Sequence, residues 1–185
     1  MTNPKIGIIV GSTRPSRIGP SIADWLQKQL KTPYLDVDVI DLAQIDLPLL
    51  DEIAMPSDGH YELEHTKNWS RLIQGYQGFV LLFPQYNWGY PAPLKNALDC
   101  LYSEWRGKPV SMVSYGGRGG FQAALALSLV LRGLKFHRLS TNIEISLKPA
   151  DLDSHGHFKA PNQALAPYEF NVQQLSAEFQ HVLTD

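Results

Sequence analysis

The chain has 185 residues, and one domain usually takes roughly 150, so we expect a single domain over residues 1–185. With 44% hydrophobic and only 18% charged residues the chain can bury a substantial core, which excludes a largely disordered protein. The net charge of −2 gives no electrostatic basis for binding nucleic acid or an anionic membrane surface, so neither partner is expected.

The cysteine content and the apolar stretches bear on the compartment. The single cysteine, Cys100, excludes an intramolecular disulfide and a cysteine-rich zinc site. The longest nearly continuous apolar stretch, 123–131, has about half the length that a membrane-spanning helix needs. The apolar run near the amino terminus is too short and too lightly flanked for a secretory signal. We therefore expect a cytoplasmic protein.

Hydrophobic periodicity predicts strands and helices that alternate along the chain. A buried strand at 5–10 precedes a helix at 18–30, and acidic and apolar residues alternate over 35–40, which is typical of an edge strand. An irregular stretch follows to about residue 61. The later pattern predicts helices at 63–76, 92–102, 121–131 and within 162–183, with strands at 78–83 and 109–114 and a fifth strand region at 136–145.

This alternation predicts an α/β fold. Strands separated by helices pair in parallel through right-handed crossovers, which places helices on both faces of the sheet. Five strands with a half-polar second strand fit a doubly wound parallel sheet of order 2-1-3-4-5. In such sheets ligands bind beyond the carboxyl ends of the strands, where the strand order reverses. The segments after Val10, Phe83 and Ser114 are therefore the expected places for a site.

The first of these segments, 11–19, reads Gly-Ser-Thr-Arg-Pro-Ser-Arg-Ile-Gly and joins a strand to a helix. A phosphate dianion suits this segment, which offers free N–H groups at the helix start, the hydroxyls of Ser12, Thr13 and Ser16, and the guanidinium groups of Arg14 and Arg17. The segment lacks both the GxGxxG pattern and a Gly-Lys-Ser/Thr ending, which disfavours dinucleotide and triphosphate sites. A capped helix start with exposed arginines is the alternative interpretation. The spacing does not say which arginine would face the phosphate.

The second and third segments add ring-binding and backbone-donor features. Residues 83–91, Phe-Pro-Gln-Tyr-Asn-Trp-Gly-Tyr-Pro, combine aromatic faces with amides, as a flat and partly polar heterocycle requires. Residues 114–120, Ser-Tyr-Gly-Gly-Arg-Gly-Gly, let backbone N–H groups approach a ring edge and meet developing negative charge. A turn whose aromatics fill a neighbouring surface and an ordinary flexible connection are the alternatives. Three such loops at the three expected positions favour one shared site.

Together these motifs resemble the NADPH-dependent FMN reductases of the flavodoxin-like superfamily, which includes quinone, chromate and azo-dye reductases. The resemblance rests on Gly11-Ser-Thr-Arg-x-x-Arg-x-Gly19, on Pro84-Gln-Tyr-Asn87 with the following Pro93-Leu-Lys-Asn-Ala-Leu-Asp99, and on Ser114-Tyr-Gly-Gly-x-Gly-Gly120. It covers residues 4 to about 131, and the carboxy-terminal third carries no recognised motif. The family often has Pro-Glu-Tyr-Asn in the second loop, where this chain has Gln85.

The resemblance implies an FMN site with assigned residues. Ser12, Thr13, Arg14 and Arg17 would hold the phosphate, with the helix start at Gly19 behind them. Isoalloxazine atoms N5 and O4 would lie near the second loop, and N1 and O2 near the third. The residues implied at the ring are Pro84, Gln85, Tyr86, Asn87, Ser114, Tyr115, Gly116 and Gly117.

The resemblance also implies the reaction and its partners. NADPH, or NADH, would pass hydride to flavin N5, and a small acceptor such as free flavin, a quinone, an azo compound or a metal oxyanion would then take two electrons. The chemistry would reside in the flavin, so no catalytic side chain is expected. Exposed aromatics beside the second loop indicate a homodimer or homotetramer.

Two other functions remain open from the sequence. One is a flavodoxin-like electron carrier without nicotinamide turnover, although carriers of that kind tend to be more acidic than a chain of charge −2. The other is a non-redox module that binds a different phosphate ligand. His155 and His157 flank Gly156 in a polar loop, but their spacing does not indicate a metal site, and none is expected.

Overall fold

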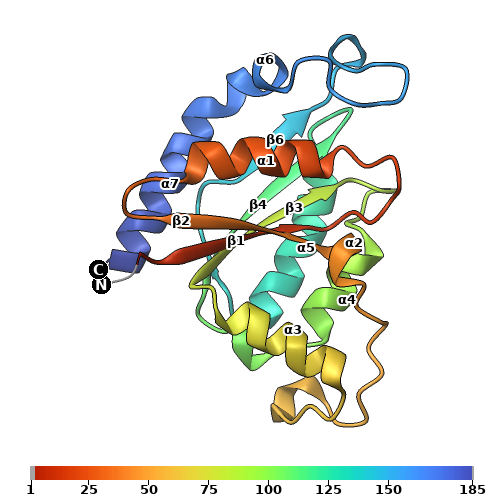
Figure 1. Ribbon diagram of the computed structural model, residues 1–185, viewed down its shortest axis with the longest axis vertical. Helices are drawn as coiled ribbons and strands as arrows, with labels where there is room; N and C mark the ends of the chain where they lie inside the picture. Colours follow the sequence, from red (N-terminus) through yellow and green to blue (C-terminus); the bar gives the residue numbers. More distant parts are fainter. Residues whose placement is uncertain (1–2, 185) are drawn as a thin grey trace.

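The computed structural model describes residues 3–184, and its sheet confirms the expected parallel order (Figure 1). Strands β2, β1, β3 and β4 lie side by side in that order, and two short strands, β5 and β6, both pair with β4. The strands are β1 (Lys5–Val10), β2 (Asp36–Asp41), β3 (Gly78–Pro84), β4 (Pro109–Gly116), β5 (His137–Arg138) and β6 (Ile143–Ser146). The helices are α1 (Gly19–Leu30), α2 (Leu42–Ile45), α3 (Glu64–Gln74), α4 (Ala92–Asp99), α5 (Phe121–Gly133), α6 (Pro161–Leu165) and α7 (Glu169–Thr184). Four short 3₁₀ helices complete the regular structure of the described residues, at Pro56–Asp58, Ser103–Trp105, Pro149–Asp151 and Ala166–Tyr168.

The fifth strand region predicted at 136–145 is two strands rather than one. The N–H groups of Ser140 and Thr141 donate to the carboxylate of Glu178 on α7, at 2.6 and 3.0 Å. The side chain of Asn142 then accepts from the N–H of Met112 on β4 at 3.0 Å. In the residues between β5 and β6, these side-chain hydrogen bonds take the place of backbone pairing with β4. The pairing along β4 is therefore interrupted, and two short strands result.

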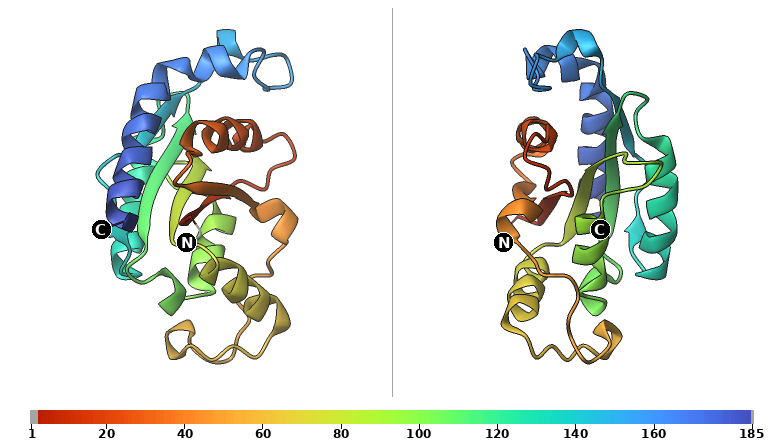
Figure 2. Two further views of the ribbon diagram at one scale, coloured as in Figure 1. Left: turned by 60° about the vertical axis from the view of Figure 1, so that its left-hand side comes forward. Right: turned by 90° about the vertical axis from the view of Figure 1, so that its right-hand side faces the viewer.

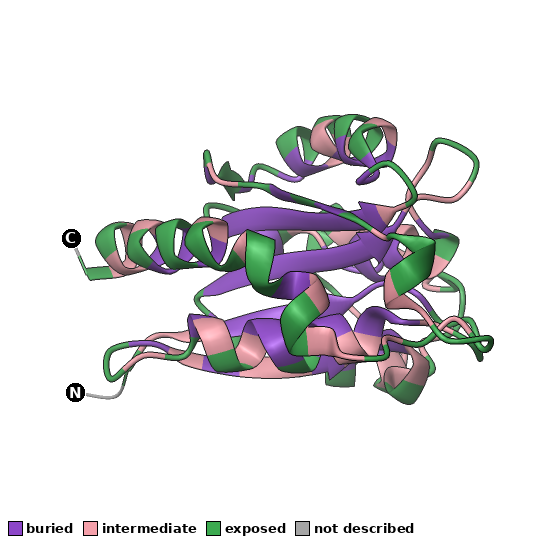
Figure 3. Cartoon of the chain, turned by 90° about the horizontal axis from the view of Figure 1, so that it is seen from above, coloured by how far each residue is buried: buried purple, intermediate pink, exposed green. Residues whose placement is uncertain are grey.

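Two hydrophobic cores enclose the sheet, one on each face. Adjacent strand residues point to opposite faces, so Ile8 packs under α1 and α7 while Ile9 packs under α3, α4 and α5. The buried strands form a continuous layer between partly exposed helices, as the view from above shows (Figure 3). This double cover explains why β3 is apolar along its whole length whereas β2, the edge strand, alternates.

Helix α4 ends at Asp99, before the predicted end at residue 102, because tryptophan side chains take its last carbonyls. The indole N–H of Trp69 donates to the carbonyl of Ala97 at 2.8 Å, and that of Trp105 donates to Leu98 at 3.0 Å. These bonds satisfy carbonyl groups that another helical turn would otherwise use. The aromatic contact between Trp69 and Trp105, with ring centroids 6.2 Å apart, is buried beneath α3 and α4.

The strand register brings the three expected loops to one end of the sheet. Val10 lies opposite Leu82, and Pro84 lies opposite Tyr115, so β1, β3 and β4 end side by side. The long loop before α6 projects beyond the sheet at that same end, as Figure 1 and the left view of Figure 2 both show. A segment from the carboxy-terminal third therefore lies near the predicted site.

Candidate functional site

The three loops border one hollow of about 240 Å³ at the carboxyl ends of the strands. Its lining comes from all three loops and from two later residues. The lining residues are Arg14, Ser16, Arg17, Ile18, Pro84, Gln85, Tyr86, Tyr115, Gly116, Leu147 and Gly156. Of the residues expected at the cofactor, Arg14, Arg17, Pro84, Gln85, Tyr86, Tyr115 and Gly116 are thus brought together.

Ser12 and Thr13 point to different places although they are neighbours. The hydroxyl of Ser12 is buried and lies 2.7 Å from the hydroxyl of Tyr86, which ties the first loop to the second. Thr13 is exposed and lines a separate hollow on the other side of the loop. The structure therefore places Ser12 beside the expected flavin pocket and Thr13 outside it.

The two arginines of the first loop have different surroundings. Arg14 is exposed, and its guanidinium lies 5.8 Å from the centre of the Tyr86 ring. Arg17 turns inward and forms an ion pair with Asp41 through Nη2, in which the side chains are only 17% and 10% exposed. The Nε of Arg17 is buried and has no hydrogen-bond partner within residues 3–184. A buried donor without a partner is costly, and one N–H of this guanidinium is left without an acceptor among the described residues.

Tyr115, which lines the hollow, lies close to Gly19 at the start of α1. A Cβ added to Gly19 would lie 3.0 Å from the Tyr115 hydroxyl, so a larger residue here would require the Tyr115 side chain to shift. Burial raises the pKa of Tyr115 well above its usual range, and the nearby Tyr86 adds to the shift. The phenol of Tyr115 therefore stays neutral and keeps its proton for a hydrogen bond.

The second loop is a tight turn, and the side chain of Gln85 at its start forms a structural hydrogen bond with α5. Asn87 and Trp88 have φ of 46° and 70°, and the backbones of Tyr86 and Gly89 exchange two hydrogen bonds of 2.8 Å. This is the geometry of a two-residue turn with both central residues left-handed. The Oε1 of Gln85 accepts from the N–H of Ala123 at 3.2 Å, so this side chain satisfies a free donor in the first turn of α5.

The third loop is held open by its glycines. The Ser114 hydroxyl donates to the carbonyl of Gly119 at 2.7 Å and is used within the loop itself. Gly120 has a φ of 89°, and a Cβ there would lie 3.0 Å from Ser114, so the turn needs glycine. A Cβ on Gly117, by contrast, would meet no described atom within 4 Å. Gly117 is therefore exposed, and it is not among the residues that line the hollow.

The carboxy-terminal third supplies a wall that the sequence did not indicate. Residues 151–159 form a hairpin in which Leu152 pairs with Phe158, and both of these side chains pack against the core. One Asp153 oxygen accepts from the N–H groups of His155 and His157, at 2.8 and 2.9 Å, and so fixes the tip.

Gly156, at a φ of 80°, lies in that tip and lines the hollow. Glycine within a polar loop was the only sequence signal, and it is a weak one. Within the described part of the chain, no group of three or more metal-ligating side chains occurs, here or elsewhere.

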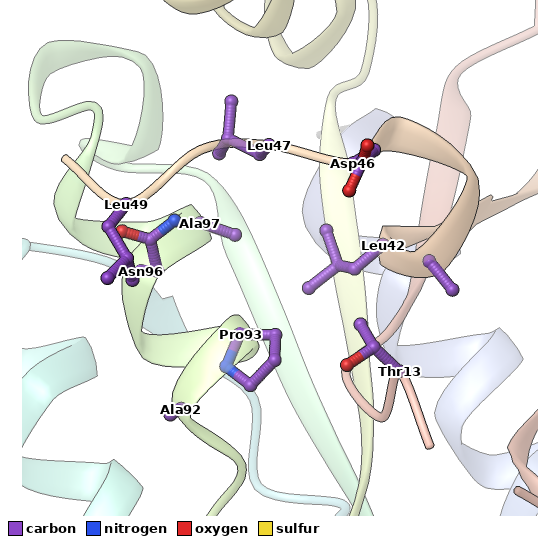
Figure 4. Close-up of a pocket in the computed structure, with 10 residues that line it drawn as sticks. Thr13, Leu42, Asp46, Leu47, Leu49, Ala92, Pro93, Asn96 and Ala97 are labelled. Atoms are coloured by element: carbon purple, nitrogen blue, oxygen red, sulfur yellow. The ribbon is translucent and has the colours of Figure 1, made fainter. Parts of the chain in front are cut away.

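A second and larger hollow of about 430 Å³ lies beside the first loop, between α2 and α4 (Figure 4). It is lined mainly by apolar side chains, including Leu42, Leu47 and Pro93, with Thr13 at the edge nearest the first loop. Asn96 holds its outer wall by donating to the carbonyl of Pro48 at 2.7 Å and accepting from the N–H of residue 50 at 2.9 Å. The sequence did not predict this hollow, because α2 and α4 are far apart in the chain.

Comparison with known proteins identifies the family. The family model for NADPH-dependent FMN reductases matches residues 4–146. The chain belongs to this family. It is 42% identical over 145 residues to an NAD(P)H-dependent FMN reductase of Saccharomyces cerevisiae, covering 72% of this chain and 76% of the relative. It is 46% identical over 147 residues to a reductase of the same description from Schizosaccharomyces pombe, covering 78% and 74%.

The fold comparison agrees with the family. A flavoenzyme NAD(P)H:(acceptor) oxidoreductase from Paracoccus denitrificans superposes with a TM-score of 0.74 at 20% identity, covering 96% of this chain and 98% of that one. The flavodoxin-like fold and the family resemblance expected from the sequence are both confirmed. This member of the FMN reductase family is thus an oxidoreductase of the FMN- and NAD(P)H-dependent class. The hairpin 151–159 lies outside the matched region 4–146.

Proposed function

We propose that the protein passes hydride from NADPH, through FMN bound where the three loops meet, to a small acceptor such as free flavin, a quinone, an azo compound or a metal oxyanion. The observation that carries this proposal is the shared hollow of about 240 Å³, which residues of all three loops line, Arg14 and Arg17 among them. When bound, the flavin supplies the two-electron chemistry at its N5.

The surroundings fit a mononucleotide at both of its ends. Arg17 and Arg14 both line the hollow and bring positive charge for a phosphate, Arg14 from an exposed position. The exposed backbone at Gly117 leaves room for a ring edge, and its N–H can stabilise negative charge there. We therefore assign the phosphate to the first loop and the ring to the second and third. Thr13, which faces the other hollow, would contribute through its backbone.

The side chains at this site position the ligand and take no covalent part. The Tyr115 phenol stays neutral because burial raises its pKa. Cys100 is buried away from the lining residues, and burial raises the pKa of its thiol to about 12, so it is not a nucleophile. We propose that the protein's role is to bind, orient and stabilise charge.

We propose that the protein forms a homodimer or homotetramer. Apolar side chains stand exposed along one segment near the larger hollow, with Leu49 77%, Ile53 92% and Met55 66% exposed, and Trp88 of the second loop is also exposed. Such exposure is unusual for a monomer and typical of surfaces that a subunit covers. Gel filtration is expected to give a multiple of the 20.7 kDa chain mass, and a strict monomer would contradict the proposal.

We also propose that residues 1–185 act as one domain in the cytoplasm. Both hydrophobic cores share the same sheet, which supports a single folding unit. Among the residues that the structure describes, no helix has the length and apolar character to cross a bilayer. Fractionation of cells that produce the protein is expected to place it with the cytoplasmic proteins.

Absorption spectroscopy and steady-state kinetics test the function in two steps. Purified protein is expected to carry or bind FMN and to show the yellow spectrum of an oxidised flavin. NADPH consumption with a quinone or free flavin then separates a reductase from an electron carrier. A protein that binds FMN but leaves NADPH unconsumed with every acceptor would contradict the proposed reaction.

A further inference from the structure

We propose that Asp41 is a positioning residue for the phosphate of the flavin, acting through Arg17. This inference rests on the proposed FMN site. It assigns a function to a carboxylate that belongs to none of the three loops and that touches the loop only through one guanidinium.

Asp41 lies at the edge of the sheet next to the first loop. It is the last residue of β2 and stands opposite Val10, the last residue of β1, so it sits beside the point where the first loop leaves the sheet. Its Oδ1 accepts from the N–H of Ala43 at 3.1 Å, which fixes the carboxylate at the start of α2. The carboxylate therefore has a defined place before it meets any partner from the loop.

Asp41 holds the guanidinium of Arg17 in one place. The other oxygen, Oδ2, accepts from Nη2 of Arg17, in an ion pair that is mostly buried. An arginine side chain loses rotamer freedom when a ligand fixes it in one geometry, and this loss weakens binding. Because Asp41 already fixes Arg17 in the free protein, ligand binding loses less entropy. Arg17 lines the hollow, so the ion pair holds this side chain at the wall of the proposed phosphate site.

Asp41 could instead oppose the ligand, because a carboxylate near a phosphate dianion repels it. The two roles predict opposite results for Asp41→Asn, which removes the charge and one of the two oxygen acceptors. If Asp41 positions Arg17, this variant binds FMN more weakly. If Asp41 mainly repels phosphate, the same variant binds FMN more tightly.

The experiment titrates the full-length protein with FMN and with riboflavin, which lacks the phosphate, and follows the quenching of flavin fluorescence. We expect Asp41→Asn to weaken FMN binding by about tenfold and to leave riboflavin binding unchanged, because the lost interaction acts only on the phosphate. Asp38→Asn is the matched control. Asp38 lies on the same strand and pairs with Lys5, opposite Gly7 and away from the first loop. It should leave both affinities within about twofold of the wild type, since exposed ion pairs contribute little.

A double variant shows whether the effect passes through Arg17. Added to Arg17→Ala, Asp41→Asn should weaken FMN binding no further, because coupled residues are not additive. Unchanged or tighter FMN binding by Asp41→Asn would overturn the proposal, and so would equal weakening of FMN and riboflavin, which indicates a general structural role. A wild type that does not distinguish FMN from riboflavin would instead overturn the phosphate site itself.

Discussion

The first loop and the hairpin 151–159 line the same hollow but contribute to it in different ways. The first loop brings charge, with Arg17 paired to Asp41 and Arg14 exposed above Tyr86. The hairpin brings shape, because Gly156 lines the hollow through a left-handed backbone at its tip. Charge from the first loop should decide which end of the ligand binds there, whereas the hairpin should decide how closely the cavity encloses it.

Arg17→Ala is expected to have the largest effect on cofactor binding. It removes the guanidinium beside the hollow, so FMN affinity should fall by at least about tenfold, or roughly 1.4 kcal/mol, while riboflavin affinity stays the same. Flavin fluorescence titration measures both. Arg132→Ala, an exposed arginine in the last turn of α5, is the matched control and should change neither. If Arg17→Ala lowered the affinity for FMN and for riboflavin equally, Arg17 would support the shape of the pocket and would not bind the phosphate.

Gly156→Val tests the hairpin in the same titration. A β-branched residue is strained at a φ of 80°, by roughly 1–2 kcal/mol, so the hairpin tip should shift and loosen the cavity. FMN and riboflavin should both bind about fivefold more weakly, with their ratio unchanged. Gly59→Val is the matched control, since Gly59 has a φ of 68°, also lies in open space and is remote from the hollow. If Gly156→Val weakened FMN binding but not riboflavin binding, the hairpin would contribute to binding of the phosphate.

Arg14→Ala should have a smaller effect than Arg17→Ala. Arg14 is exposed and its described contact is with the Tyr86 ring, so water screens its charge. We expect FMN affinity to fall about threefold at low salt and by less at high salt. An effect of Arg14→Ala that equals that of Arg17→Ala and is insensitive to salt would show that the exposed arginine is the main phosphate ligand.

Gln85→Ala should affect stability more than binding, because the Gln85 side chain contacts the N–H of Ala123 in α5. Loss of this bond should lower the free energy of unfolding by about 0.5–1.5 kcal/mol, measured by urea denaturation. Gln85→Glu keeps an oxygen acceptor and should retain most of the stability. If Gln85→Ala instead weakened flavin binding at unchanged stability, the side chain would belong to the ligand site.

The sequence predicted those features that depend on local pattern. Strand and helix alternation gave the sheet order, and motifs at the strand ends located the three loops. The end of α4 and the break between β5 and β6 were not predictable in this way. The bonds from Trp69 and Trp105 to α4, and from Glu178 to residues 140 and 141, join segments distant in the chain.

The same limit explains what the sequence missed at the site. Arg17 and Asp41 are 24 residues apart, and only the parallel register of β1 with β2 brings them together. The sequence predicts that β1 and β2 are neighbouring parallel strands, so their ends could be expected to lie side by side. It does not predict that the Arg17 side chain turns toward the Asp41 carboxylate. Gly156 reaches the hollow because Leu152 and Phe158 pack the hairpin against the core, which no motif records.

A crystal structure of the protein with bound FMN tests the central claim most directly. We expect the phosphate to contact the Arg17 guanidinium and the isoalloxazine ring to be bordered by Tyr86 and Gly117, within the hollow that Gly156 lines. Flavin bound instead between α2 and α4, against Leu42 and Pro93, would contradict it. So would a structure in which the three loops close over one another and leave no room for the ring.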